Sequence, residues 1–229
     1  MQGQFGENLV LRLLDQTPVQ HNLEAFGFFK NDLEMLYQAS HAPSGLILMV
    51  GSTGSGKTTT LYAILNALNS QEKNILTIEN PIEYNIEGIT QFSVKLEQSL
   101  GFADTLRAAL RQDPDVLLMG EIRDEETANI AVKAALTGHL VLSTLHSSDA
   151  VTAIQRLLNL EIAPDLLAET LTVIVSQRLV HRLCSHQNGN KSNPRTSDKN
   201  CLRCRGTGYS GRIPVYEILK VNSMVRDRI

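Results

Sequence analysis

The feature that most constrains this chain is the run Gly51–Thr58, whose letters are GSTGSGKT. It fits the pattern GxxxxGK[ST], a loop that wraps the phosphates of a nucleotide. Glycines let the backbone bring its N–H groups close to phosphate oxygens. We expect Lys57 to contact the β- and γ-phosphates and the Thr58 hydroxyl to bind Mg²⁺. The residues expected to contact the nucleotide are Gly51, Ser52, Thr53, Gly54, Ser55, Gly56, Lys57, Thr58 and Thr59.

The residues on either side give this loop the context that it requires. Leu46–Val50 is a continuous apolar run, as in a strand that is buried on both faces. Thr59–Leu68 has its leucine and isoleucine residues on one helical stripe. The N-terminus of a helix carries the partial positive charge that a phosphate favours. Nucleotide binding therefore fits better than the alternative, a surface turn rich in glycine and serine.

Composition limits the class of protein. The chain has 229 residues, of which 42% are hydrophobic, enough to bury a substantial core. The formal charge of -3, the pI near 6.1 and the absence of Trp give no indication of nucleic-acid binding. No apolar run is long enough to span a bilayer, and three cysteines do not indicate a disulfide framework. We expect a cytoplasmic protein, with no nucleic acid among its partners.

Apolar runs and helical patterns alternate along the chain, and this predicts the fold class. Besides 46–50, we expect strands over 75–78, 116–119 and 140–145. We expect helices over 31–40, 59–68, 125–136, 149–158 and 166–183, and in the second half of 96–112. The alternation indicates an α/β domain with a mostly parallel sheet flanked by helices. A small cysteine-containing loop subdomain would follow it.

Acidic side chains follow two of the expected strands. In a parallel sheet, ligands bind beyond the carboxyl ends of the strands, where the phosphate loop also lies. Glu121 comes just after the strand over 116–119 and can orient water or hold the metal, as a Walker-B acid does. The alternative for Glu121 is an ion pair with Arg123. Glu79 and Glu83 can extend the metal's water shell, or they can cap or be solvated around a proline turn.

Two histidines flank the strand over 140–145. His146 ends that strand and can sense the γ-phosphate through a hydrogen bond, although a lone histidine at a strand end is more often structural. His139 stands before the strand, after Gly138, and both interpretations remain open for it. The phosphate loop, the acids and His146 follow four different strands, so their convergence on one site is stronger evidence than any one of them.

These motifs together resemble the secretion ATPase superfamily, which drives type II secretion and type IV pilus assembly. The matching segments, in the family's order, are GSTGSGKTTTLY at 51–62, IENPIE at 78–83, LRQDPDVLLMGEIRD at 110–124, TGHLVLSTLH at 137–146 and QRLVHRLC at 177–184. The resemblance implies a RecA-like P-loop domain that binds ATP or ADP with Mg²⁺. It implies hexameric rings at the inner face of the inner membrane. ATP hydrolysis there would power pilin or pseudopilin polymerisation.

The resemblance also implies roles for single residues. It makes one residue the catalytic glutamate, two the carboxylates of an acidic box, and two the histidines that respond to the γ-phosphate: Glu121, Glu79, Glu83, His139 and His146. Two positions depart from the family's pattern. Asn80 stands where Asp is usual in the acidic box, and Ser52 stands where Pro is usual in the phosphate loop. Asn80 leaves the charge of that box to the two glutamates.

The resemblance suggests three parts. Residues 1–19 would be a remnant of an N-terminal domain and linker, since 5–14 looks like that domain's last strand. Residues 20–180 would be the RecA-like ATPase core. Residues 181–229 would hold the cysteine-containing subdomain and a truncated C-terminal region. The family completes its site with arginines from the N-terminal domain and linker, of which Arg12 is the one candidate here.

The cysteines form a group with metal-ligand spacing. Cys201 and Cys204 make a CxxC pair, and Cys184 lies upstream. In a cytoplasmic protein this spacing indicates a structural Zn²⁺ site. Three thiolates need a fourth ligand, which His186 or His181 could supply; the alternative is a degenerate site without metal. Related assembly and secretion ATPases carry two CxxC pairs here and retraction ATPases generally lack them, which favours assembly or secretion.

Two other functions besides a fibre-assembling ATPase are compatible with parts of this sequence. RecA-like folds also pump nucleic acid, but the acidic composition and the lack of a basic face with aromatics count against that function. A nucleotide-dependent docking hub with little turnover is a third possibility, and the intact Lys57, Thr58 and Glu121 argue against it. The sequence does not name the machine, which could be type II secretion, a type IV pilus or DNA uptake. Partners in either of the first two would include an inner-membrane platform protein and a cytoplasmic adaptor.

Overall fold

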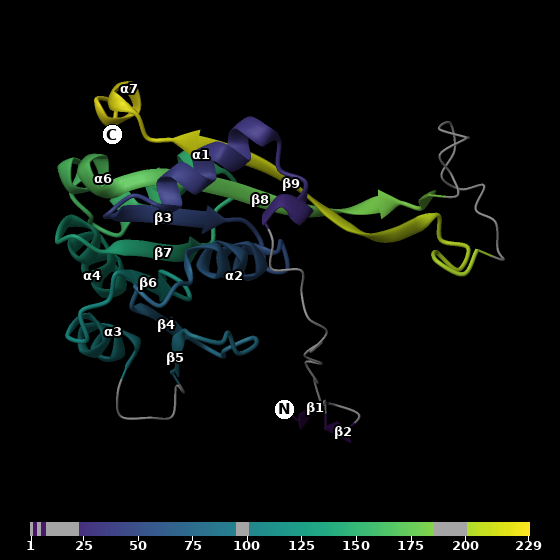
Figure 1. Ribbon diagram of the computed structural model, residues 1–229, viewed down its shortest axis with the longest axis horizontal. Coiled ribbons are helices and arrows are strands. Elements are labelled where there is room, and N and C mark those ends of the chain that lie inside the picture. The colour runs from purple at the N-terminus through teal and green to yellow at the C-terminus, as the bar shows by residue number, and fades with distance from the viewer. Residues whose placement is uncertain (1, 4–5, 8–22, 95–100, 186–200) are drawn as a thin grey trace.

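A seven-stranded sheet forms the centre of the molecule (Figure 1). The computed structural model describes residues 2–3, 6–7, 23–94, 101–185 and 201–229. In spatial order, the strands are β5 (Thr90–Ser93), β4 (Ile75–Glu79), β6 (Val116–Met119), β7 (Leu140–Leu145), β3 (Gly45–Val50), β8 (Leu171–Leu183) and β9 (Tyr209–Lys220). Neighbouring strands are parallel except β8 and β9, which are antiparallel. The predicted α/β class with a mostly parallel sheet is confirmed.

Helices cover both faces of this sheet (Figure 1). The helices are η1 (Leu23–Phe26), α1 (Lys30–Ser40), α2 (Lys57–Leu68), α3 (Phe102–Leu110), α4 (Glu125–Leu136), α5 (Ala150–Asn159), α6 (Pro164–Thr170) and α7 (Ser223–Arg226). Helices α1 and α2 pack on one face of the sheet, and α3, α4, α5 and α6 pack on the other. A separate antiparallel pair, β1 (Gln2–Gly3) and β2 (Gly6–Glu7), lies near the N-terminus. None of the helices within the described ranges is both long and apolar enough to cross a membrane.

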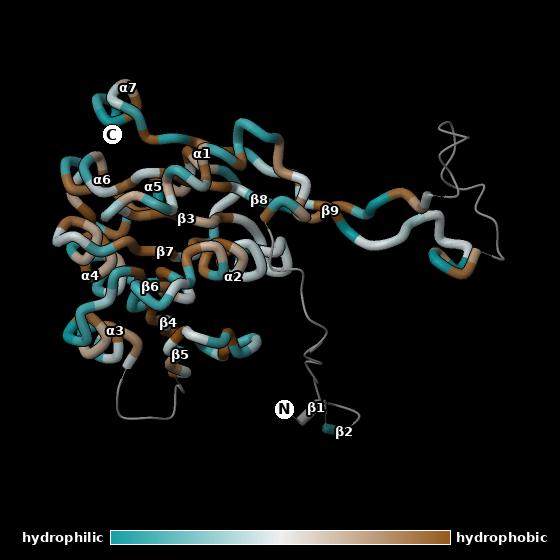
Figure 2. The backbone as a smooth tube through the Cα atoms, in the orientation of Figure 1, coloured by the Kyte–Doolittle hydropathy of each residue, from teal (hydrophilic) through white to brown (hydrophobic). Residues whose placement is uncertain are grey.

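The central strands are largely apolar because both of their faces are buried. In β3, Leu46 and Leu48 point to the core under α3–α6, whereas Ile47 and Met49 point to the core under α1 and α2. Figure 2 shows the hydrophobic residues concentrated along these strands. This arrangement explains why the strands appear in the sequence as continuous apolar runs rather than as alternating ones.

The other predicted central elements are also found. Strands β4, β6 and β7 match their predicted apolar runs to within one residue, and α4 has the predicted bounds. The Asp149 carboxylate accepts a hydrogen bond from the Thr152 backbone N–H, at 2.7 Å, and so caps α5. Asp124 caps α4 in the same way, through Thr127 at 2.8 Å. The predicted N-terminal strand over 5–14 lies outside the described residues, apart from the two residues in β2.

The helix predicted over 166–183 is wrong. Helix α6 ends at Thr170, and the chain continues as β8. All four residues of the run Thr172–Val175 are β-branched, and the run is held between β3 and β9. Pairing on both sides, which local sequence does not reveal, fixes this segment as a strand. Strands β5 and β9 were not predicted.

Strands β8 and β9 continue beyond the sheet as a two-stranded arm (Figure 1). We use the name β8–β9 arm for residues 178–183 and 209–215. Gln177, opposite Tyr216, is the last residue of the buried first half of β8. Side chains in the arm are largely exposed, and the three cysteines lie at its outer end. The backbone N–H of Cys184 donates to the Gly208 carbonyl at 2.9 Å, which links the arm to the cysteine-bearing turn.

Candidate nucleotide site

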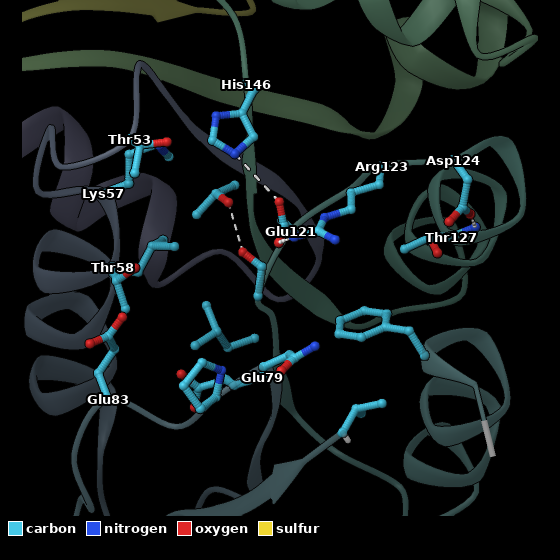
Figure 3. Close-up of a pocket in the computed structure, with 18 of the residues that line it drawn as sticks. Thr53, Lys57, Thr58, Glu79, Glu83, Glu121, Arg123, Asp124, Thr127 and His146 are labelled. Carbon is cyan, nitrogen blue, oxygen red and sulfur yellow. Dashed lines mark hydrogen bonds and ion pairs between the residues drawn. The ribbon is translucent and has the colours of Figure 1, made fainter. Parts of the chain in front are cut away.

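A cavity of about 620 Å³ opens at the carboxyl ends of β3, β4, β6 and β7 (Figure 3). Four connections that are distant in the sequence supply its lining. The predicted site residues that line it are Thr53, Gly54, Lys57, Thr58, Glu79, Glu83, Glu121 and His146. The structure therefore brings the phosphate loop, the acids and His146 together, as their positions after strands predicted.

The phosphate loop has the backbone conformation that its glycines allow. Gly51, Gly54 and Gly56 have φ values of 143°, 76° and 88°. Residues with side chains rarely adopt these angles. Gly56 is the N-cap of α2, so the N-terminus of α2 faces the loop. This geometry presents backbone N–H groups to an anion.

The Lys57 ammonium lies inside the loop. Its Nζ donates to the carbonyl oxygens of Gly51, at 2.8 Å, and Ser52, at 3.0 Å. Burial lowers the pKa of Lys57, although the charge of Glu121 acts in the opposite direction. The two carbonyl oxygens thus hold the lysine beside the cavity. They are uncharged acceptors, which a negatively charged phosphate oxygen can replace.

Glu121 is held between two basic side chains at the end of β6. Its carboxylate accepts a short hydrogen bond from Arg123 and lies 3.4 Å from His146 Nε2 (Figure 3). Partial burial raises the pKa of Glu121, but the hydrogen bond and charge of Arg123 outweigh it and lower the pKa overall. Glu121 thus lines the cavity and also pairs with Arg123, so the ion pair does not exclude a role of Glu121 at the cavity.

Glu79 is buried in a hydrogen-bond network. Its carboxylate accepts hydrogen bonds from Tyr62 Oη, from Thr77 Oγ1 at 2.7 Å and from Gln91 Nε2 at 3.3 Å. Burial and the bond to Glu79 raise the pKa of Tyr62. Glu83 is exposed and lines the cavity, and its backbone N–H donates to Tyr62 Oη at 3.4 Å. The two glutamates of the acidic segment therefore differ: one is buried and fully bonded, and the other can meet a ligand.

The structure does not bring His139 to this cavity. His139 precedes β7 and His146 follows it, so the six residues of β7 separate them by roughly 20 Å. The His139 carbonyl accepts from the Gly45 N–H at 3.1 Å, at the start of β3, whereas the phosphate loop follows the end of β3. The His139 ring lies 3.0 Å from the Ala134 carbonyl, at the end of α4. His139 and His146 are close in sequence but thus lie at opposite ends of β7.

Two supporting residues were missed from the sequence. The sequence predicts Tyr62 within a helix and indicates no role for it at the site, but its hydroxyl donates a hydrogen bond to the Glu79 carboxylate. Thr144 donates to the Gly120 carbonyl at 2.7 Å and accepts from the Ile122 N–H at 2.9 Å, so β7 fixes the segment that carries Glu121. Both positions offered the same signal, which is a side chain with a polar group among buried apolar neighbours.

The three cysteines gather at the outer end of the arm. Their sulfur atoms all lie within 4.8 Å of one another, and Cys184 and Cys201 are 3.7 Å apart. Hydrogen bonding by the Cys204 backbone N–H lowers the pKa of Cys201 to about 7. Among the described residues, His181 is not part of this group; its ring packs on Tyr209, with centroids 5.6 Å apart. His186 lies outside the described residues.

Comparison with known proteins gives consistent matches. A family model described as type II/IV secretion system protein matches residues 2–229. Type II secretion system protein E of Pectobacterium carotovorum is 46% identical over 243 residues, which cover 98% of this chain and 48% of that protein. The type IV pilus assembly ATPase PilB of Pseudomonas aeruginosa is 43% identical, over 94% of this chain and 41% of PilB. The chain thus spans about half the length of these relatives.

Solved structures show the same fold. The pilus retraction motor PilT with bound ADP superimposes with a TM-score of 0.73 and 34% identity, over 94% of this chain and 57% of PilT. The ATPase DotB of Legionella pneumophila superimposes with a TM-score of 0.69 and 27% identity, over 90% of this chain and 52% of DotB.

Proposed function

Because the chain belongs to the type II/IV secretion system protein family, we propose that it binds ATP with Mg²⁺ in the cavity described above and hydrolyses it. The main support is that Lys57 and Thr58, at the start of α2, and Glu121, after β6, line one cavity at the carboxyl ends of parallel strands. The relatives named as ATPases and the ADP in the PilT structure support the same proposal.

The residues present fit a triphosphate and its metal. The glycines of the loop and the N-terminus of α2 suit phosphate oxygens, and the Lys57 ammonium would neutralise their charge. The Thr58 hydroxyl would hold the magnesium ion, which when bound neutralises charge on the phosphates. Glu121 would orient the attacking water. Its low pKa keeps it ionised, as this role requires.

His146 would respond to whether the γ-phosphate is present. Its ring already contacts Glu121 in the structure, so a change at the phosphate would alter that contact. Glu83 would act on the water around the metal, whereas the buried Glu79 would fix the shape of the acidic segment. Glu79 and Glu83 both line the cavity, and their proposed roles differ because the Glu79 carboxylate is buried and hydrogen-bonded whereas Glu83 is exposed.

Replacing Lys57 tests nucleotide binding. We expect Lys57→Ala to lower affinity for ADP and ATP with Mg²⁺ at least about a hundredfold, because a buried charge-assisted contact is lost. Titration calorimetry measures this. Lys133→Ala, on the exposed side of α4, is the matched control and should bind as the native chain does. Native-like binding by Lys57→Ala would contradict the proposal.

We further propose that hydrolysis powers assembly of a pilin-like fibre, for type II secretion or a type IV pilus. The names of the relatives support this larger role. The complete protein would then act as a homohexamer in the cytoplasm, held at the inner membrane by a platform protein and an adaptor. Deleting the gene and scoring pilus assembly and secretion separately would distinguish the two machines.

The cysteine group would hold a structural zinc ion. Three sulfur atoms within 4.8 Å of one another suit tetrahedral zinc, and His186 is the proposed fourth ligand. Metal analysis of the purified chain should give about one zinc per chain, and Cys204→Ser should lose most of it. Zinc well below that ratio, and unchanged by added zinc, would contradict the site.

A further inference from the structure

The side chain of Gln177 joins the phosphate loop to the root of the β8–β9 arm. Gln177 is only 1% exposed, although the next residue along β8 is exposed. Its Nε2 donates to the Ser55 carbonyl at 2.8 Å, and its Oε1 accepts from Thr60 Oγ1 at 2.9 Å. The amide of this one side chain therefore makes hydrogen bonds both to the phosphate loop and to the first turn of α2.

The loop is built to let Gln177 approach. A Cβ atom on Gly51 would lie 2.4 Å from the Gln177 carbonyl oxygen, and one on Gly56 would lie 2.8 Å from Gln177 Nε2. The Gln177 carbonyl belongs to the backbone and cannot move away, so Gly51 is required by Gln177 as well as by a phosphate. A side chain at Gly56 would instead push against the amide end of the Gln177 side chain.

The amide cannot be replaced by another polar group of the same shape. The Ser55 carbonyl can only accept a hydrogen bond, so the group that faces it must be a donor. Thr60 is fully buried, and its hydroxyl lies 2.9 Å from Gln177 Oε1 and 3.2 Å from the Gly56 carbonyl, so the amide oxygen is the nearer of its two acceptors. An amide supplies a donor and an acceptor at once, whereas a carboxylate at the same place would oppose the Ser55 oxygen.

The backbone of Gln177 lies where the arm begins. It pairs with Tyr216 of β9. The Tyr216 hydroxyl accepts from the Phe29 N–H at 2.6 Å and donates to Asp32 at 3.0 Å. The root of the arm is thus fixed to α1 on one side and to the phosphate loop on the other, which leaves little freedom to move the loop without moving the arm.

We propose that Gln177 is a positioning residue that sets the phosphate loop for nucleotide and couples nucleotide occupancy to the β8–β9 arm. This inference rests on the proposed nucleotide binding. The Gln177 side chain does not line the nucleotide cavity, and it would act through Ser55 and Thr60. Loss of the amide should therefore weaken nucleotide binding without removing any group that touches the phosphates.

Affinity for ADP with Mg²⁺ tests the positioning. We expect Gln177→Glu to bind about tenfold more weakly at alkaline pH, because a buried hydrogen bond becomes an oxygen–oxygen contact. The loss should shrink as pH falls, since a protonated carboxyl group donates to the Ser55 carbonyl again. This recovery excludes misfolding as the cause. Gln155→Glu, an exposed site on α5, is the matched control and should match the native affinity throughout.

The native chain is measured at each pH, so titration of Lys57, Glu121, His146 and the nucleotide cancels in the ratio of affinities. Normal native binding with equal affinity for Gln177→Glu at every pH would overturn the inference and leave the proposed function intact. Absence of ADP binding by the native chain would instead overturn the proposed function.

Hydrogen exchange tests the coupling to the arm. Saturating ADP should slow exchange of the amides of residues 178–183 in the native chain. It should not do so in Gln177→Leu, which keeps the strand but loses both hydrogen bonds. An equal response of the arm in the two proteins, or no response in the native chain, would overturn the coupling.

Discussion

The two halves of β8 are one continuous strand in two different surroundings. Residues 171–177 are nearly all buried between β3 and β9, whereas residues 178–183 are largely exposed and pair only with β9. The first half packs in the hydrophobic cores on both faces of the sheet and hydrogen-bonds to the phosphate loop. The second half is held by one ladder of hydrogen bonds and by the cysteine group. Pairing with one neighbour thus continues the strand beyond the core, where the side chains are less buried and contribute less to stability.

The largest expected effect separates these two halves directly. We expect Ile174→Ala, at a fully buried site, to lower the free energy of unfolding by about 2–5 kcal/mol, through lost burial and the cavity that it leaves. Urea unfolding measures this. Val180→Ala, where the side chain is 42% exposed, should cost less than about 1 kcal/mol. Equal losses of unfolding free energy in the two variants would mean that the Val180 side chain is buried in solution.

A smaller effect is expected at the acidic segment beside the cavity. Tyr62→Phe removes the hydroxyl that donates to the buried Glu79 carboxylate, so we expect a loss of about 1–3 kcal/mol in unfolding free energy. Tyr209→Phe, on the exposed arm, is the matched control and should change stability little. If both variants unfold at the same urea concentration as the native chain, the Tyr62–Glu79 bond does not stabilise the site.

The smallest effect concerns a surface cap and appears as pH dependence. Hydrogen bonds from Thr152, first its backbone N–H, lower the pKa of Asp149 to about 2, from an ordinary value of 3.8. The ionised cap therefore stabilises the folded chain fully above pH 3.8 and loses this effect as pH falls toward 2. The stability difference between the native chain and Asp149→Ala should shrink over that range.

Urea unfolding across the same pH range measures that difference. Asp149→Asn keeps an acceptor oxygen but cannot titrate, so its stability relative to Asp149→Ala should stay constant with pH. A native-minus-alanine difference that does not change between pH 3.8 and 2 would show that the Asp149 cap does not act through its charge.

The cavity was well predicted from the sequence because each of its parts follows a short, apolar, fully buried strand. Such runs are easy to recognise, and parallel pairing places their carboxyl ends at one edge. His139 shows the limit of this reasoning. It is close to His146 in the chain, but it stands at the opposite end of β7. The role expected of His139 came from the family resemblance, and a motif along the chain does not show at which end of a strand each residue lies.

The arm was poorly predicted because contacts distant in sequence determine it. Residues 171–183 mix apolar and basic side chains at spacings that also fit a helix, and pairing with β3 and β9 makes them a strand. The Gln177 amide likewise gave no local indication that it would reach Ser55 and Thr60, which are more than 100 residues away. Partners of this kind become visible only when the sheet is assembled.

Turnover by Glu121→Gln, measured beside nucleotide affinity, tests the central claim most directly. We expect this variant to bind ATP with Mg²⁺ about as well as the native chain but to hydrolyse it at least about a hundredfold more slowly, since a positioned base is lost. Glu125→Gln, on the exposed first turn of α4, should hydrolyse ATP at the native rate. Native-like hydrolysis by Glu121→Gln would contradict the account.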